Sequence, residues 1–170
     1  STTSPLIDFT PFLDGPSGTP LDGNFIWGPI TTNTTWSAAN SPYLLIGSTT
    51  VLPGVTLTLE AGVSVQVKGN YRIDIQGSLQ ATGTSGQPIQ FVSGKATPAI
   101  GDWQGLRFSG SSSGSLTQTQ VRDASTDIDF ASSGTLSLTQ VAIQHAGTGL
   151  TLTGTGAVTL QDSTVSQYNI

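Results

Sequence analysis

The 170-residue chain contains no cysteine and no methionine, and few of its residues are charged. Without cysteine there is no disulfide framework, no thiolate metal site and no cysteine nucleophile. Charged residues make up 9% of the chain, against roughly 25% in typical soluble domains. With 5 basic and 10 acidic residues, no basic face can hold a phosphate backbone, and no apolar run is long enough to span a bilayer. We therefore expect neither nucleic acid nor a membrane as a partner.

The missing methionine also bears on where the protein works. The chain begins at Ser1, which indicates a processed mature product or a segment cut from a longer chain. The two oxidation-prone side chains are both absent, which suits an oxidising environment. We expect a secreted protein that is extracellular or attached to the cell surface.

In place of charge the sequence has hydroxyl groups, from 26 Thr and 21 Ser. From Ile30 onward, short runs alternate apolar and polar residues, as at 55–59 and 63–67, and glycines separate the runs. Alternation with a period of two and many β-branched residues is typical of strands, and no window has an amphipathic helical period. Residues 30–170 are predicted to be all-β.

Residues 1–29 form a different kind of segment. Four prolines interrupt the apolar residues between Ser1 and Trp27. Each proline lacks a backbone N–H and biases the residue before it toward extended geometry. The sequence predicts an irregular, proline-rich N-terminal arm that carries five apolar anchors: Leu6, Ile7, Phe9, Phe12 and Leu13.

An internal repeat decides the fold class. Residues 115–118, Ser-Leu-Thr-Gln, recur 22 residues later at 137–140, and at that offset apolar positions fall on apolar positions. A third copy begins at residue 159, places Val165 in the apolar register and stops at Ile170, about halfway through its period. A period near 22 suits one coil of a three-sided β-solenoid, whose coils stack at about 4.8 Å. About six coils would make a rod about 30 Å long.

Several motifs add a family resemblance to this reading. The segments at 52–63 (LPGVTLTLEAGV), 77–83 (GSLQATG), 87–91 (QPIQF) and 101–106 (GDWQGL) resemble the right-handed parallel β-helix domains of secreted and surface-attached bacterial proteins. The resemblance implies an all-β, right-handed parallel β-helix. It does not imply an activity, because polysaccharide lyases, adhesins, phage spikes and ice-binding proteins share this architecture.

One cluster of ionisable residues is a candidate for chemistry: Arg122, Asp123, Asp127 and Asp129, with His145 placed over Asp123 by the repeat. The positions equivalent to Arg122 and Asp127 on the next coil are uncharged, so the cluster is not extended there. Asp127 and Asp129 are too few ligands for Ca²⁺, which takes six to eight oxygens. We expect no catalytic, cofactor or metal site, so that the protein is not an enzyme; a degraded carbohydrate-active enzyme is the rival hypothesis.

The many threonines suggest an alternative function, an ice-binding or carbohydrate-binding module. Thr-x-Thr pairs occur at 56–58 and 151–153, but the repeat places Thr151 and Thr153 over Asp129 and Ala131 instead of another pair. Three tryptophans are candidates for stacking on sugar rings, although a buried or end-capping role is commoner for this residue: Trp27, Trp36 and Trp103.

The two ends of the chain indicate the function that we favour. In sequences of the family resembled, a segment like residues 4–13 follows the final coil and closes the solenoid, whereas here it comes first. The incomplete last coil is expected to leave an open edge, which templates pairing with another chain. We expect a structural protein in which the arm of one copy completes the C-terminal end of the next, as a head-to-tail filament subunit or a unit of a tandem-repeat adhesin. Its partner is then itself, with surface glycans as a further candidate, and the expected interface comprises Leu6, Ile7, Phe9, Phe12, Leu13, Val165, Tyr168 and Ile170.

Overall fold

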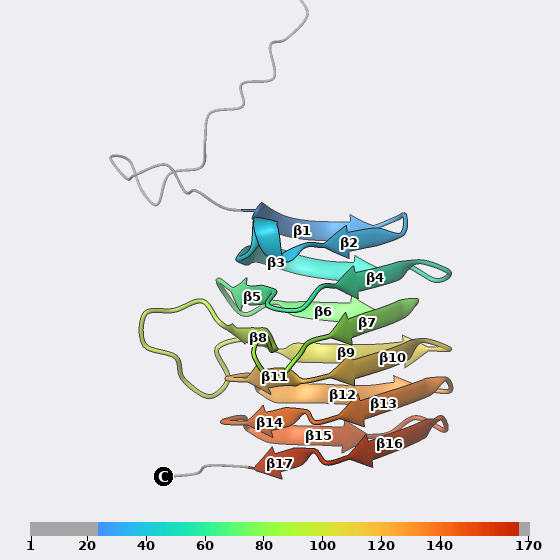
Figure 1. Ribbon diagram of the computed structural model, residues 1–170. Helices are drawn as coiled ribbons and strands as arrows, with labels where there is room; N and C mark the ends of the chain where they lie inside the picture. Colours follow the sequence, from blue (N-terminus) through green and yellow to red (C-terminus); the bar gives the residue numbers. More distant parts are fainter. Residues whose placement is uncertain (1–23, 167–170) are drawn as a thin grey trace, which may run out of the picture.

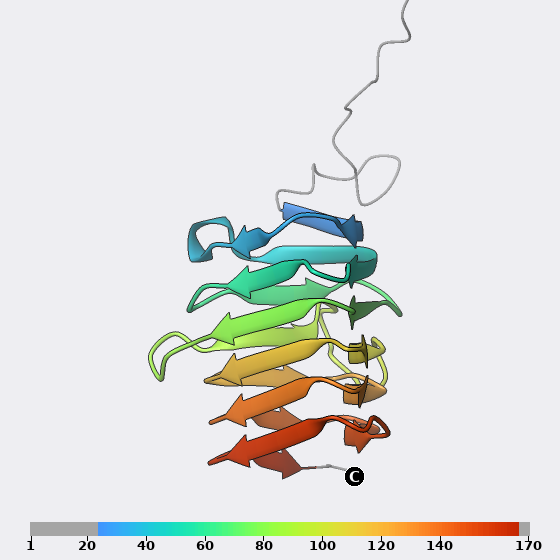
Figure 2. The same ribbon diagram turned by 90° about the vertical axis from the view of Figure 1, so that its right-hand side faces the viewer.

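A computed structural model describes residues 24–166, which form a parallel β-solenoid of about six coils (Figures 1 and 2). Each full coil contributes a strand segment to each of three faces, and every pairing between coils is parallel. One 3-10 turn, η1 (Ala38–Asn40), interrupts the first coil. The predicted all-β solenoid and its repeat of about 22 residues are confirmed.

The strands group into three stacks. The first face consists of the N-terminal halves of β1 (Asn24–Ile30) and β3 (Tyr43–Val51) with β5 (Ser64–Val67), β8 (Ile89–Ser93), β11 (Thr119–Arg122), β14 (Ala142–Gln144) and β17 (Thr164–Ser166). The second face consists of the C-terminal halves of β1 and β3 with β6 (Arg72–Ile75), β9 (Gly105–Gly110), β12 (Thr126–Ser132) and β15 (Thr148–Leu152). The third face consists of β2 (Thr34–Trp36), β4 (Thr56–Leu59), β7 (Ser78–Thr82), β10 (Ser113–Thr117), β13 (Thr135–Thr139) and β16 (Ala157–Gln161).

The alternating sequence explains the core. In β4 and β5 every second residue is buried, and the hydroxyl or amide residues between are partly exposed. The buried residues stack from coil to coil because register partners lie one period apart: Leu116 pairs with Leu138, and Val121 with Ile143. The interior is thus a column of Leu, Val, Ile and Phe side chains, as the repeat predicted.

The arm is shorter than expected at its C-terminal side. Strand β1 begins at Asn24 and pairs with β3 through Ile30, so the solenoid includes residues 24–29, which the sequence predicted to belong to the arm. Pro29 is compatible with this strand because β1 is an edge strand, where a missing N–H breaks no ladder within the described residues.

A large departure from the 22-residue spacing separates the third coil from the fourth on the second face. Register partners on the second face, Arg72 and Gly105, are 33 residues apart, because the loop at 94–104 is inserted between β8 and β9. This loop projects from the stack in Figure 1. The chain rejoins the stack at Gly105, whose φ is +99° and where a Cβ atom would lie 1.7 Å from the carbonyl oxygen of Thr126. Only glycine fits that position.

Apolar side chains are exposed at both ends of the stack. At the C-terminal end Leu152, Leu160 and Val165 are 55%, 44% and 45% exposed, and at the N-terminal end Trp27 is 61% exposed. Within residues 24–166, β15, β16 and β17 each have a strand partner on one side only. In the part of the chain that the structure describes, no helix has the length and apolar character to cross a membrane.

Candidate functional site

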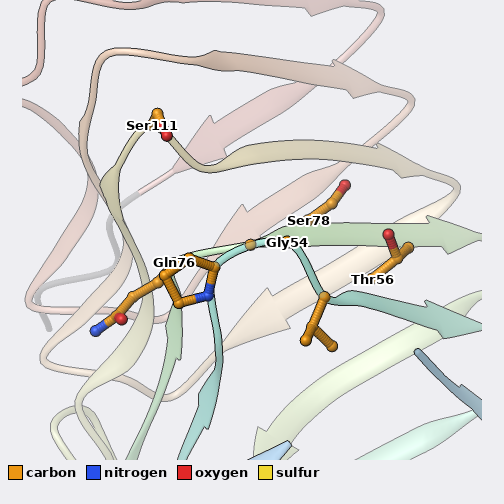
Figure 3. Close-up of a pocket in the computed structure, with 8 residues that line it drawn as sticks. Gly54, Thr56, Gln76, Ser78 and Ser111 are labelled. Carbon is orange, nitrogen blue, oxygen red and sulfur yellow. The ribbon is translucent and has the colours of Figure 1, made fainter. Parts of the chain in front are cut away.

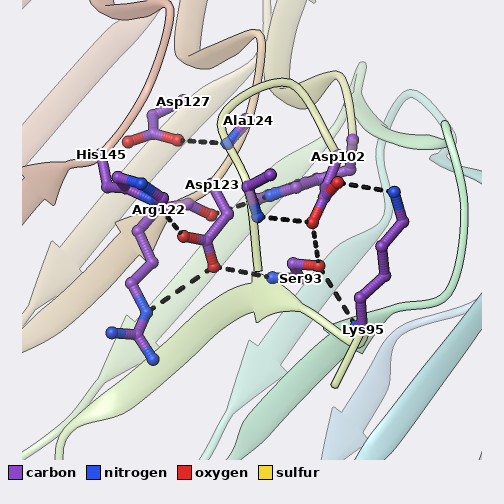
Figure 4. Close-up of polar contacts among 10 residues, drawn as sticks. Ser93, Lys95, Asp102, Arg122, Asp123, Ala124, Asp127 and His145 are labelled. Carbon is purple, nitrogen blue, oxygen red and sulfur yellow. Dashed lines mark hydrogen bonds and ion pairs between the residues drawn. The ribbon is translucent and has the colours of Figure 1, made fainter. Parts of the chain in front are cut away.

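The turns between the first and second faces bring together the ionisable side chains of three successive coils (Figure 4). The fourth coil contributes the ends of the inserted loop, the fifth contributes the turn between β11 and β12, and the sixth contributes the turn between β14 and β15. The residues of this polar cluster are Ser93, Lys95, Asp102, Arg122, Asp123, Asp127 and His145.

Asp123 and His145 form a rung between coils five and six. The Asp123 carboxylate Oδ1 lies 2.7 Å from His145 Nδ1, and the Asp123 N–H donates to the His145 carbonyl at 3.0 Å. Both residues have positive φ, 73° and 56°, a conformation in which Asp and His are enriched among non-glycine residues. The predicted placement of His145 over Asp123 is confirmed. The shared backbone geometry gives this pair a structural explanation without catalysis.

The second oxygen of the Asp123 carboxylate is also occupied. Asp123 is 2% exposed, and its Oδ2 accepts a hydrogen bond from the Ser93 N–H at 3.1 Å and lies 3.8 Å from Arg122 Nε. A buried carboxylate needs such partners to offset the loss of hydration. The His145 side chain is 41% exposed, and in the described chain Nδ1 is the ring atom with a hydrogen-bond partner. No hydroxyl nucleophile is therefore held against the other ring nitrogen within residues 24–166.

Asp102 anchors the inserted loop. Its carboxylate accepts from Lys95 Nζ at 2.6 Å, from Ser93 Oγ at 2.6 Å and from the Ala99 N–H at 2.9 Å. Burial by itself would raise the pKa of Asp102, but these donors favour the charged form more strongly and lower the pKa to about 2. With both oxygens engaged, this carboxylate is suited to hold the loop.

Asp127 is a buried acid with an incomplete set of partners. Its Oδ1 accepts from the Ala124 N–H at 3.2 Å, whereas Oδ2 has no hydrogen-bond partner in the described chain. Burial is the main cause that raises the pKa of Asp127, the negative charge of Asp123 adds to it, and backbone hydrogen bonds oppose both, so that the pKa is about 7. Near neutral pH this group therefore exchanges between its neutral and charged forms.

The structure divides the cluster that the sequence predicted. Arg122, Asp123 and His145 lie together, whereas Asp129 lies on the second face, 3.7 Å from Arg107 Nε. Sequence reasoning missed Ser93, Lys95 and Asp102 as parts of the cluster. Their contacts arise from the inserted loop, which has no period, so neither the repeat nor the alternation gives a signal for them.

Metal ions are bound by clusters of ligating side chains. Among residues 24–166, no group of three or more His, Cys, Asp or Glu side chains is arranged to hold a metal ion. The acids of the polar cluster are instead paired with donors of the protein itself, apart from Asp127 Oδ2.

The third face is a second candidate surface. Its partly exposed positions carry hydroxyl and amide groups in register across five strands, for example the column Thr58, Gln80, Ser115, Ser137 and Thr159. The corresponding column of the second face instead carries charged residues, including Asp74, Arg107 and Asp129.

A pocket of about 230 Å³ opens beside this hydroxyl face (Figure 3). Thr56 and Ser78 of the face line it together with Gln76 and Ser111, and no charged residue is among its lining residues. The uncharged lining favours a neutral ligand over an ionic one. The Thr-x-Thr pair at 151–153 is not part of this face, because Thr151 pairs with Asp129 as the repeat predicted.

The tryptophans are mostly structural. Trp103 is fully buried and its Nε1 donates to the Arg122 carbonyl at 2.8 Å, and Trp36 is 3% exposed and stacks on Tyr43 at 4.9 Å. Neither is accessible to a sugar ring, whereas Trp27 is exposed at the N-terminal end.

Seven of the eight expected interface residues lie outside the described residues: Leu6, Ile7, Phe9, Phe12, Leu13, Tyr168 and Ile170. Val165 is described. It pairs with Ile143, as the repeat predicted, and it is 45% exposed at the C-terminal end.

Comparison with known proteins agrees with the fold. Residues 28–147 match the model of a family described as the pectate-lyase-like β-helix domain. The chain belongs to this family. No curated protein and no solved structure matches the chain. The family membership of this β-helix domain specifies its architecture and leaves its role to be argued from its own residues.

Proposed function

We propose that this β-helix domain is a structural extracellular unit that stacks head to tail, in a self-assembling surface filament or a tandem-repeat adhesin, and that it is not an enzyme. The observation that carries the proposal is the pair of open apolar ends, with Leu152, Leu160 and Val165 exposed at one and Trp27 at the other. Exposed strand edges and apolar patches of this kind favour pairing with another chain.

The registers of the two ends support head-to-tail stacking. Followed from coil to coil, the column of Leu152 runs through Phe130, Phe108, Ile75 and Val51 to Ile30. The column of Leu160 runs in the same way through Leu138, Leu116, Ala81 and Leu59 to Trp36. The ends therefore present matching cross-sections. A contact between them is heterologous and does not close, so it produces a linear polymer.

The length and position of the arm suit the gap between two such copies. Strand β17 starts a new coil on the first face, so the positions that would cover β15 and β16 are the second and third faces of that coil. The arm precedes Asn24, where the first face of the next copy begins, and its 23 residues equal about one period. The arm of one copy can thus supply the layer that covers Leu152 and Leu160 of its neighbour.

The polar cluster supports a structural role more than a catalytic one. General acid–base catalysis needs an ionisable group that can reach a substrate atom. The carboxylate oxygens of Asp102 and Asp123 are engaged by donors of the protein, and Asp127 is fully buried. The same contacts fix the inserted loop and join coils four, five and six.

Electron microscopy of the full chain tests the proposal. We expect the protein to form fibres. Phe12→Ala should shorten or abolish them, because removal of a buried Phe side chain typically costs about 3–5 kcal/mol. The β-sheet circular dichroism of the variant should stay unchanged. The matched control is Thr151→Ala, on a side chain of the second face. Monodisperse particles at all concentrations would contradict stacking. Polysaccharide cleavage that is lost in an Asp123→Ala, His145→Ala variant would contradict the non-enzymatic role.

The hydroxyl face favours a second candidate function, binding to ice or to a neutral carbohydrate. Ser115→Asp with Ser137→Asp places charge in the middle of this face, and Gln144→Asp places it on the first face as the control. If the face binds such a surface, only the first variant loses ice-crystal shaping or pelleting with an insoluble neutral polysaccharide.

A further inference from the structure

An apolar pocket of about 250 Å³ opens at the N-terminal end of the stack, among residues of β1 and β2. Five apolar residues and one threonine line it: Phe25, Ile26, Trp27, Ile30, Thr34 and Trp36. Beneath it, Trp36 stacks on Tyr43 with the ring centroids 4.9 Å apart and the planes within 16°. The pocket therefore offers the exposed indole of Trp27 as a wall above the nearly buried ring of Trp36, and such a wall suits a planar apolar side chain.

The connection of the chain identifies the occupant. Residues 1–23 lead directly into Asn24, the first residue of β1, and both β1 and β2 line the pocket. In this solenoid the segment preceding a first-face strand crosses the second and third faces of the coil above. For the arm, those positions lie over Ile30 and over Trp36, because Ile30 belongs to the second face and Trp36 to the third.

The composition of the arm fits the pocket. Within residues 4–13, five of ten residues are large and apolar, and two of these are phenylalanines. Two phenylalanines stand on either side of Thr10-Pro11, and a proline biases the residue before it toward extended geometry, which favours presentation of both aromatic rings. Burial of Trp27 and of these rings would remove a patch of exposed apolar surface from the end of the molecule.

We propose that residues 4–13 cover the N-terminal pocket of their own chain, with Phe9 and Phe12 as the anchors against the exposed Trp27. This inference refines the proposed function and rests on it only for the opposite side of the arm, which would contact the neighbouring copy. The arm is then one shared layer, bound in cis on one side and in trans on the other.

Quenching of tryptophan fluorescence by iodide tests the cis contact in the full chain. Trp36 and Trp103 are 3% and 0% exposed, so a quencher in the solvent reports mainly on Trp27, and a Trp27→Phe variant confirms that assignment. At a concentration where ultracentrifugation shows only monomers, we expect weak quenching. The Phe9→Ala, Phe12→Ala variant should raise the quenching constant several-fold with unchanged circular dichroism, and Ser17→Ala, in the same arm, should not.

The outcomes separate the cis contact from stacking. Strong quenching in the wild-type monomer overturns the cis contact. If the quenching becomes weak only in fibres, the neighbouring copy covers Trp27 and the head-to-tail proposal alone survives. Weak quenching in the monomer that the double variant relieves supports the cis contact, and it does so even if no fibres form, in which case the proposed function alone fails.

Discussion

At the residue scale, the buried carboxyl group of Asp127 links stability to pH. Its pKa is about 7 in the folded protein against 3.8 for the free group, so the folded state binds more protons between these values. Stability must then fall as the pH rises from about 4 to about 7, by up to about 4 kcal/mol at about 1.4 kcal/mol per pKa unit.

Asp127→Asn removes this titration. We expect the free energy of unfolding of the variant to equal that of the wild type near pH 4 and to exceed it at pH 8, because an amide cannot ionise in the buried site. Urea denaturation at both pH values measures the difference. Asp129→Asn, two residues along the same strand and paired with exposed Arg107, is the control and should keep the wild-type pH slope between pH 5 and 8. A wild-type protein as stable at pH 8 as at pH 5 would contradict the assignment.

The pKa of Asp102 is shifted in the opposite direction, so its effect on stability has the opposite dependence on pH. Its folded pKa of about 2 lies below the free value of 3.8, so it contributes stability above about pH 4 that is lost as the pH falls toward 2. Asp102→Ala removes three hydrogen bonds that hold the inserted loop, including that of Lys95. We expect trypsin to cleave after Lys95 faster in this variant at neutral pH.

Asp74→Ala is the matched control for the loop, since it breaks a 2.7 Å ion pair with Arg72 inside strand β6. Cleavage after Lys95 should not change in that variant, because this ion pair lies within strand β6 and makes no contact that holds the inserted loop. Equal cleavage in both variants would show that Asp102 does not anchor the loop.

At the scale of the element, Gly114 in β10 of the third face leaves room for a side chain from β9 of the second face. The column of Leu57, Leu79, Leu136 and Val158 has glycine at this coil. A Cβ atom at Gly114 would lie 2.6 Å from Phe108 Cε1 and 2.8 Å from Leu136 Cδ1, so the Phe108 ring fills the space of the missing side chain. A small residue in β10 is thus matched to a large residue in β9.

Gly114→Ala should therefore destabilise the protein by about 1–3 kcal/mol through overpacking. Adding Phe108→Leu should recover part of the loss, so that the two changes are not additive in a double-mutant cycle measured by urea denaturation. Gly86→Ala, with no atom within 4 Å of its added Cβ, is the control and should be nearly neutral. Additive effects would show that the two sites do not share this space.

At the scale of the whole molecule, the open C-terminal end is the feature that assembly depends on. Leu160 is 44% exposed on β16, and its neighbour Thr159 belongs to the hydroxyl face of the same strand. Leu160→Asp should abolish fibres without unfolding the domain, because it places an unpaired charge in the stacking contact at a side chain that is already 44% exposed in the single copy. Thr159→Asp carries the same charge one residue away and should still assemble. Sedimentation velocity measures both, and fibres of the Leu160→Asp variant would contradict the end-to-end contact.

The sequence by itself determined the strands, the three faces and the register of the last three coils. These follow from alternation and from the 22-residue period, since stacking places each residue on the one that lies one period away, as with Leu116 on Leu138 and Asp123 under His145. A periodic sequence therefore contains its own contact map wherever the period is kept.

Only the tertiary structure decided the features that break the period. The inserted loop shifts the partner of Arg72 from 22 to 33 residues away, and the contacts of Asp102 form within that loop. The charge state of Asp127 depends on burial and on Asp123, and the glycine at 114 depends on a ring from the adjacent strand. Such properties arise from packing between side chains that no repeat relates, so they exist only in the folded chain.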